Sequence, residues 1–266
     1  MSTINTLLTI ANDARKGASW RDKWLSFLVT GLIVMGKHRI NLRKWWLKQI
    51  DNLSIHNTLE IKLKIEGKVK YFSMRRGNEA DYIIGGELLK GSYKVPDFEP
   101  KIIIDGGANI GMFAIHSNSY FPQAKLICYE PDKDNVQQLQ KNLDLNNIEA
   151  EIRKLGLWSK ETILYYHVSE SHIGFIDENP PGTPIPCTLP EIKSDCWLKL
   201  DIEGAEYEVL PALFQKGQYP RWISMEIHYF NTKGESLLTL LREHGYEIEG
   251  DVDFAVNCTV ISAYRN

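Results

Sequence analysis

The chain has 266 residues, enough for one large domain or for one domain with a smaller appendage. Hydrophobic residues make up 43% of it and charged residues 24%, which are ordinary values for a water-soluble globular protein. The formal net charge of −3 argues against a dedicated nucleic-acid binder, which usually carries a large excess of Lys and Arg.

The cysteine pattern indicates a reducing compartment, and the first residues do not resemble a signal peptide. No two cysteines form a C-x-x-C pair, so neither a zinc site nor a disulfide framework is expected. Free thiols are predicted at Cys128, Cys187, Cys196 and Cys258. The first twenty residues are polar and lack the apolar core of a signal peptide. We therefore predict a cytoplasmic protein.

Residues 1–57 are predicted to form an N-terminal helical segment. Residues 20–50 are rich in Trp, Leu, Lys and Arg and contain no Pro. Their uncharged centre, residues 24–36, has 13 residues, whereas a membrane-spanning helix needs about 20. Two interpretations remain open. The segment is either a pair of helices packed on the main domain or on a partner subunit, or an interfacial helix on an anionic membrane with Trp at the headgroup level.

Residues 58–100 are predicted to form a β-hairpin followed by a connector helix. Apolar and charged residues alternate strictly over 58–66, as in a strand with one wet face. Gly67 and Lys68 then turn the chain into a second strand over 69–74. A short helix is expected over 78–89, and the two prolines of residues 93–100 favour an extended connector.

Residues 101–266 alternate between strands and helices and are predicted to form the main domain. Strands are expected over 102–105, 125–130, 149–155, 197–201, 222–228, 246–249 and 257–263, and helices over 109–120, 132–145, 233–243 and from about 205. This alternation predicts a mostly parallel sheet with helices on both faces. Residues 169–186 interrupt it, and we expect an irregular loop there that acts as a lid.

Four acidic residues are expected at the carboxyl ends of the parallel strands, where ligands bind in such sheets: Asp105, Glu130, Asp201 and Glu226. The segment from Asp105 to Gly111 leaves the first strand and opens a helix, and its glycines let the backbone lie close to a ligand. It lacks the G-x-G-x-x-G spacing of dinucleotide enzymes. Asp105 would repel a pyrophosphate but attract an ammonium group, which favours a ligand made of adenosine and an amino acid.

Glu130 lies 19 residues after Gly111, at the end of the second strand. An acid about 20 residues beyond a glycine loop is placed to accept hydrogen bonds from the two ribose hydroxyls of a nucleotide. The strand, the loop, the helix and the spaced acid together predict a nucleoside site.

Several segments resemble the FkbM family of methyltransferases. They are residues 104–111 (IDGGANIG), 129–132 (YEPD), 198–206 (LKLDIEGAE) and 225–228 (MEIH), with a weaker similarity at 188–192. The resemblance spans about residues 72–230 and does not include the N-terminal segment. It implies a class I methyltransferase fold, Rossmann-like, with a seven-stranded sheet whose seventh strand is antiparallel. It also implies S-adenosylmethionine as the cofactor and methylation of a hydroxyl on a sugar, polysaccharide or natural product.

By position, the resemblance also implies which residues bind the cofactor. The methionine part falls to the glycine loop, the ribose to Glu130, and the adenine to the region around Leu157. The complete predicted set is Asp105, Gly106, Gly107, Asn109, Gly111, Glu130, Pro131, Leu157 and Asp201.

Methylation of a hydroxyl requires that its proton leaves, so a base or a metal ion is expected. We predict that Asp201 or His228 accepts the proton, and that Glu226 orients the site or shares a divalent metal with them. The metal set would be Asp201, Glu226 and His228, which suits Mg²⁺ or Mn²⁺. The structural alternatives are a packed, hydrogen-bonded role for His228 and compensation of helix charge by Glu203 and Glu206.

The predicted partner is a small-molecule or glycan acceptor, not a nucleic acid, with peripheral membrane contact or self-association through the N-terminal helices. Three other functions fit the sequence less well. A nicotinamide-dependent oxidoreductase is disfavoured by the glycine spacing and by Asp105. A nucleic-acid methyltransferase of the amino-group type is disfavoured because Asp-Ile-Glu-Gly follows the fourth strand instead of an N-P-P-Y-like motif. A non-catalytic, membrane-associated scaffold is disfavoured by three intact motifs.

Overall fold

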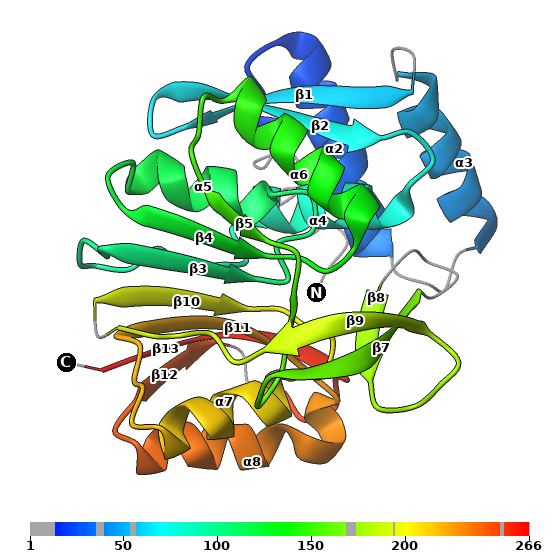
Figure 1. Ribbon diagram of the computed structural model, residues 1–266. Helices are drawn as coiled ribbons and strands as arrows, with labels where there is room; N and C mark the ends of the chain where they lie inside the picture. Colours follow the sequence, from blue (N-terminus) through cyan, green and yellow to red (C-terminus); the bar gives the residue numbers. More distant parts are fainter. Residues whose placement is uncertain are drawn as a thin grey trace. The chain divides into compact units, whose positions relative to one another are not determined.

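The structure is a computed structural model that describes residues 14–35, 40–53, 57–168, 174–193, 195–250 and 253–265. The chain divides into two compact units. The first is built from residues 1–92, 110–120 and 137–148, and the second from residues 93–109, 121–136 and 149–266. Figure 1 labels their elements.

The first unit contains the predicted helix pair and the predicted hairpin. Its helices are α2 (Trp20–Met35), α3 (Ile40–Asn52), α4 (Glu79–Lys90) and α5 (Met112–Tyr120), with the larger part of α6 (Lys133–Leu145). Strands β1 (Thr58–Ile65) and β2 (Lys68–Arg75) pair in antiparallel register from Thr58 opposite Arg75 to Ile65 opposite Lys68. The alternation of β1 buries Leu59, Ile61 and Leu63, so its apolar residues face the interior as predicted.

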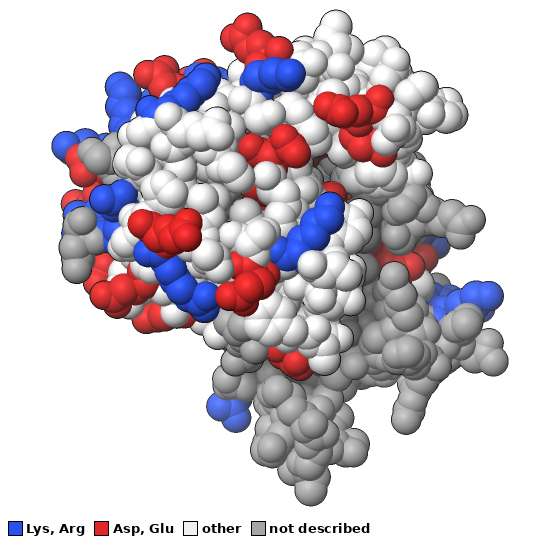
Figure 2. Space-filling model, turned by 90° about the horizontal axis from the view of Figure 1, so that it is seen from below, with Lys and Arg blue, Asp and Glu red and all other residues white. Residues whose placement is uncertain are grey.

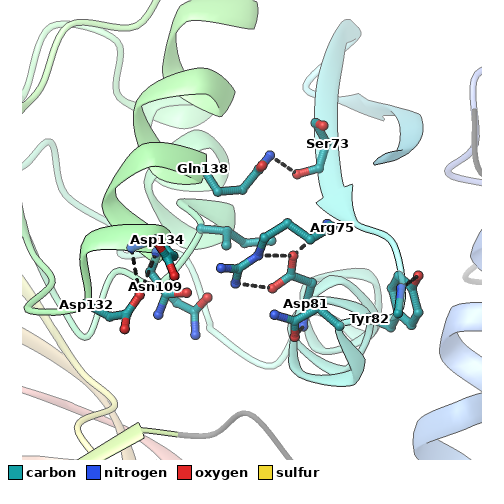
Figure 3. Close-up of polar contacts among 12 residues, drawn as sticks. Ser73, Arg75, Asp81, Tyr82, Asn109, Asp132, Asp134 and Gln138 are labelled. Carbon is teal, nitrogen blue, oxygen red and sulfur yellow. Dashed lines mark hydrogen bonds and ion pairs between the residues drawn. The ribbon is translucent and has the colours of Figure 1, made fainter. Parts of the chain in front are cut away.

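The free edge of β2 is closed by amide side chains of α6. Asn142 accepts a hydrogen bond from the Ser73 backbone nitrogen at 2.8 Å and donates one to the Ser73 oxygen at 3.0 Å. One turn further on, Asn146 makes the same pair of bonds with the backbone of Tyr71. Gln138 donates a second bond to the Ser73 oxygen (Figure 3). These amides make the backbone hydrogen bonds that a neighbouring strand would make, so this edge of β2 is not left unpaired.

A buried ion pair fixes the start of α4 in the same unit. Asp81 is fully buried and receives hydrogen bonds from the backbone nitrogen and the guanidinium of Arg75 (Figure 3). The side chain of Asn78 caps the helix by accepting a bond from the Asp81 nitrogen, and Gly91 ends it in the left-handed conformation.

The second unit is built on a seven-stranded sheet in the order β12-β13-β11-β10-β3-β4-β5. Its strands are β3 (Ile102–Gly106), β4 (Lys125–Tyr129), β5 (Glu151–Arg153), β10 (Cys196–Leu200), β11 (Trp222–His228), β12 (Glu247–Gly250) and β13 (Cys258–Tyr264). All paired neighbours are parallel except those of β13, which runs antiparallel to β11 and β12. This is the predicted mostly parallel sheet with an antiparallel last strand.

Helices α7 (Glu206–Gln215) and α8 (Phe230–Glu243) belong to this unit, and they lie together beside strands β10 to β13 in Figure 1. Their apolar faces join the core of the sheet, which includes Leu198, Met225, Leu213 and Leu241. Strands β10 and β11 are buried along almost their whole length, as expected for central parallel strands covered by other elements.

The prediction of an irregular loop over residues 169–186 is wrong for its described part. Residues 169–173 lie outside the described residues. Strands β8 (Gly174–Asp177) and β9 (Thr183–Thr188) pair antiparallel with β7 (Thr162–Val168), and β9 also pairs with β6 (Gly156–Leu157). Pro184 and Pro186 favoured a loop in the prediction, but they lie in the part of β9 that pairs only with β7, where the missing N–H groups break no second ladder.

Candidate active site

The glycine loop leaves β3 as predicted and holds an unusual backbone conformation. Gly107 and Gly111 have positive φ values of 73° and 86°, and Asn109 has a φ of 47°. A Cβ on Gly107 would collide with the carbonyl oxygen of Asp201, so the loop can approach β10 this closely only with glycine there. A Cβ on Gly106 would lie 2.7 Å from Cδ1 of Leu157, so Leu157 packs directly over the end of β3.

Glu130 lies at the end of β4 and is bound to the glycine loop. Its side chain accepts a hydrogen bond from the Asn109 backbone nitrogen at 2.8 Å, and another from the Asp132 nitrogen, beyond Pro131, at 2.9 Å. Burial raises the pKa of Glu130 to about 7, while these bonds and one from Asn135 act in the opposite direction. The carboxylate therefore lies at the end of the second parallel strand and holds the backbone of the glycine loop.

A buried lysine that is not among the predicted site residues lies at the centre of the site. Lys199 on β10 stands opposite Asp105 on β3 in the parallel register. Its Nζ donates to the Gly107 oxygen at 2.8 Å and lies 3.3 Å from Asp105 Oδ1 and 3.6 Å from Asp201 Oδ2. Burial alone would lower the pKa of Lys199, but the two carboxylates outweigh it and the pKa is raised. The lysine is therefore charged.

This lysine changes the interpretation of Asp105. From the sequence we expect Asp105 to attract the ammonium group of a ligand, whereas the fully buried carboxylate faces the ammonium of Lys199. Lys199 could have been predicted from the sequence, because it is a charged residue in the middle of the apolar run Trp-Leu-Lys-Leu.

Asp201 follows the last residue of β10 and remains partly open to solvent, with 21% of its side chain exposed. The hydroxyl of Tyr93 donates a hydrogen bond to its Oδ2 at 3.1 Å. Tyr93 comes from the connector before β3 and was not among the predicted site residues. Asp201 thus accepts a hydrogen bond from Tyr93, lies near the ammonium of Lys199 and is accessible to solvent.

His228, the last residue of β11, lies between two carboxylates. Its Nε2 is 3.0 Å from Glu203 and its Nδ1 is 3.3 Å from Glu206. Burial lowers its pKa, but both glutamates raise it, with a net result of about 12. His228 therefore carries a proton on both ring nitrogens at neutral pH. Glu206 also accepts bonds from the backbone nitrogens of Ile202 and Gly204, so it fixes the turn before α7.

Two groups of side chains in the described part of the chain have the spacing of a metal site, and both include His228. One is Asp201, Glu203 and His228, and the other is Glu226, His228 and Cys258. Within each group the ligand atoms lie within 4.8 Å of one another. The predicted set of Asp201, Glu226 and His228 does not occur as one group. Glu226 instead accepts a hydrogen bond from the Cys258 thiol at 2.8 Å.

The residues of the site fit a polar nucleoside ligand. Among the described residues, the side-chain oxygen of Asn109 is buried without a hydrogen-bond partner, which is costly unless a ligand supplies a donor. It lies in the same loop whose backbone is bound by Glu130. A glycine loop after the first parallel strand and an acid at the end of the second define the class of Rossmann-like nucleoside-binding α/β proteins.

The model of the Methyltransferase FkbM domain family matches residues 105–248, more than half of the chain. The chain belongs to this family. It is a methyltransferase with a class I, Rossmann-like fold.

Two curated relatives are similar to the chain. Methyltransferase 1 of Beauveria bassiana (strain ARSEF 2860) is 22% identical over 205 residues, which cover 64% of this chain and 82% of the relative. Methyltransferase sdnD of Sordaria araneosa is 29% identical over 105 residues, or 39% of each chain. Among solved structures, M. jannaschii TYW2 in complex with AdoMet has 14% identity and a TM-score of 0.42, over 79% of this chain and 87% of that one.

Proposed function

We propose that the protein transfers a methyl group from S-adenosylmethionine to a hydroxyl of a sugar, polysaccharide or natural product. The observation that carries this proposal is the placement of Asp201. It is a partly exposed carboxylate at the end of β10, held by Tyr93 beside the glycine loop. Bound S-adenosylmethionine supplies an electrophilic methyl group, so the protein has to position the hydroxyl and accept its proton.

The proposed cofactor contacts follow from the geometry of the loop. Gly106, Gly107 and Gly111 let the backbone pass close to the methionine part of the cofactor, and the unpaired oxygen of Asn109 accepts a hydrogen bond from it. Glu130 accepts bonds from the ribose hydroxyls, and Leu157 with Pro131 borders the adenine. Asp105 acts through Lys199 by keeping its ammonium beside the Gly107 carbonyl.

Asp201 is the better of the two predicted bases. His228 is already protonated at neutral pH because Glu203 and Glu206 raise its pKa to about 12, so it has no free lone pair for another proton. We propose that His228 positions Glu203 beside Asp201, and that Asp201 accepts the substrate proton.

An Asp201→Asn variant tests this assignment. We expect kcat to fall by about 10²- to 10⁴-fold, because general-base catalysis contributes that much, while the affinity for S-adenosylmethionine changes little. The measurement is transfer of labelled methyl to a panel of sugars and hydroxylated natural products, with O-methyl products identified by mass spectrometry. Asp144→Asn on the exposed side of α6 is the matched control. Full turnover by Asp201→Asn would rule out the base.

A metal-assisted form of the site is the second candidate, favoured by the spacing of Asp201, Glu203 and His228. We propose that Mg²⁺ or Mn²⁺ replaces the His228 proton there. Glu203→Gln should weaken Mn²⁺ binding about tenfold or more in a calorimetric titration, while Glu226→Gln should leave it unchanged. Turnover should fall after chelation and return with added Mn²⁺. Equal effects of the two substitutions on Mn²⁺ binding would contradict this placement.

The finer assignment of the partner rests on charge, and that of the location rests on the free cysteines. We propose a small-molecule or glycan acceptor instead of a nucleic acid, and a cytoplasmic enzyme. The net charge is −3, and the face shown in Figure 2 intersperses acidic and basic side chains. The division into residues 1–57, 58–100 and 101–266 remains a prediction.

A further inference from the structure

The N-terminal helix pair exposes an aromatic surface that the proposed reaction does not use. Trp20 is 87% exposed, and Trp24 and Trp45 are each 53% exposed. Exposure of this degree is unusual for Trp, which normally buries most of its ring. The described residues contain no helix that is long and apolar enough to cross a membrane.

The exposed rings form a connected surface across α2 and α3. Trp24 stacks on Phe27 with ring centroids 5.3 Å apart, Phe27 contacts Trp46 at 5.9 Å, and Trp46 contacts Trp45 at 5.8 Å. Trp46 anchors this series because its indole nitrogen donates to the Leu28 oxygen. Residues 20, 24 and 27 lie on one face of α2, since their spacing follows the helical repeat.

The opposite face of α2 is already occupied. Leu25, Leu28 and Val29 are almost fully buried in the first unit, as are Ser26 and Thr30. The aromatic residues therefore do not belong to the face of α2 that packs in the core. They form the second apolar face of a helix whose first face already packs in the interior.

The sequence of the segment that carries this surface is strongly basic. Residues 14–53 hold nine Lys and Arg against two Asp, although the whole chain has a net charge of −3. Both aspartates are engaged: Asp22 is buried and caps the start of α2 through Ser19, and Asp51 accepts a bond from Tyr82. Lys44 and Lys48 are exposed on α3 beside Trp45.

We propose that this surface, formed by Trp20, Trp24, Phe27 and Trp45 with Lys23, Lys44 and Lys48, docks the enzyme on an anionic phospholipid bilayer. Exposed Trp beside Lys is the pattern of a helix that lies in the membrane interface. Charge complementarity selects the bilayer over a second copy of the chain. A two-fold contact would set the same basic surface against itself, whereas anionic lipid headgroups attract it. The acceptor would then be reached at or near the membrane.

Vesicle sedimentation with the full chain tests the proposal. The protein should sediment with vesicles that contain phosphatidylserine and remain free with phosphatidylcholine alone. Lys44→Gln/Lys48→Gln should lower the partition coefficient about 30-fold, because each lysine near an anionic surface contributes about fivefold. Trp24→Ala/Trp45→Ala should lower it about tenfold or more, and tryptophan emission of the parent chain should shift to the blue on binding.

Matched variants separate docking from misfolding and from self-association. Lys133→Gln/Lys141→Gln removes the same charge from exposed positions of α6 and should leave binding unchanged. Circular dichroism and cofactor binding check that each variant is folded. Equal sedimentation of the parent chain and of the Trp variant would overturn the proposal. So would a concentration-dependent dimer without lipid that Trp24→Ala/Trp45→Ala abolishes.

Discussion

Replacing Lys199 with Met should lower the free energy of unfolding by about 3–5 kcal/mol, which is the usual cost of removing one partner of a buried ion pair. The lysine side chain is only 4% exposed and the Asp105 side chain is fully buried, so water cannot replace the lost ammonium. The Gly107 oxygen loses its donor in the same step. Urea unfolding followed by circular dichroism measures the change, and S-adenosylmethionine binding should weaken because the glycine loop loses this support.

A double substitution shows whether the loss of stability arises from the ion pair between Lys199 and Asp105. Asp105→Asn removes the buried charge, so Lys199→Met/Asp105→Asn should be less destabilised than the sum of the two single variants, by about 1 kcal/mol or more. Lys125→Met is the matched control. It breaks an exposed pair with Glu151 and should cost less than about 1 kcal/mol. An unchanged urea midpoint for Lys199→Met would show that the ammonium does not contribute to the stability of the fold.

The sheet and the position of the glycine loop were predictable from the sequence because both depend on local signals. Apolar runs bounded by glycine or acid mark β3, β4, β10 and β11, and the structure has these strands within one residue of the expected ends. Glu130 was predicted from its spacing to Gly111, since that spacing is set by one helix and one strand.

The contacts of the site residues could not be predicted in the same way, because they join strands that are distant in sequence. Lys199 meets Asp105 across 94 positions through the parallel register, and Tyr93 meets Asp201 across 108. His228 illustrates the limit. The alternation of β11 places Glu226 and His228 on one face, but the turn after β10 brings Glu203 and Glu206 to the imidazole instead. Both groups come from a segment with positive φ at Glu203 and Gly204, and such a turn has no periodic signal.

Replacing Glu130 with Ala should reduce S-adenosylmethionine affinity about 100-fold or more. Two hydrogen bonds from ribose hydroxyls to a charged acceptor are lost, each contributing about 1.5–3 kcal/mol. The Asn109 nitrogen also loses its partner, so the loop that carries the other cofactor contacts is no longer fixed. Calorimetric titration with S-adenosylmethionine and its demethylated product measures the loss. Glu151→Ala on the next strand, whose side chain pairs with Lys125 at the surface, should bind normally.

Because the pKa of Glu130 is raised, the proposed contact between Glu130 and the ribose should depend on pH. A carboxyl with a pKa of about 7 is mostly ionised above that pH and mostly protonated below it, and the protonated form offers one acceptor fewer to the ribose. Cofactor affinity of the parent chain should therefore fall about tenfold between pH 8 and pH 6. Folding stability changes with the opposite sign and over a lower range of pH, which overlaps the binding change only between pH 6 and about 7. Because the folded-state pKa is raised, the contribution of Glu130 to stability is greatest at low pH and declines as pH rises from the unfolded value of 4.5 to about 7. Weaker binding at pH 6 is therefore not explained by a loss of the Glu130 contribution to stability, and circular dichroism at each pH checks that the chain stays folded. A flat binding profile over this range would show that Glu130 is not the ribose acceptor.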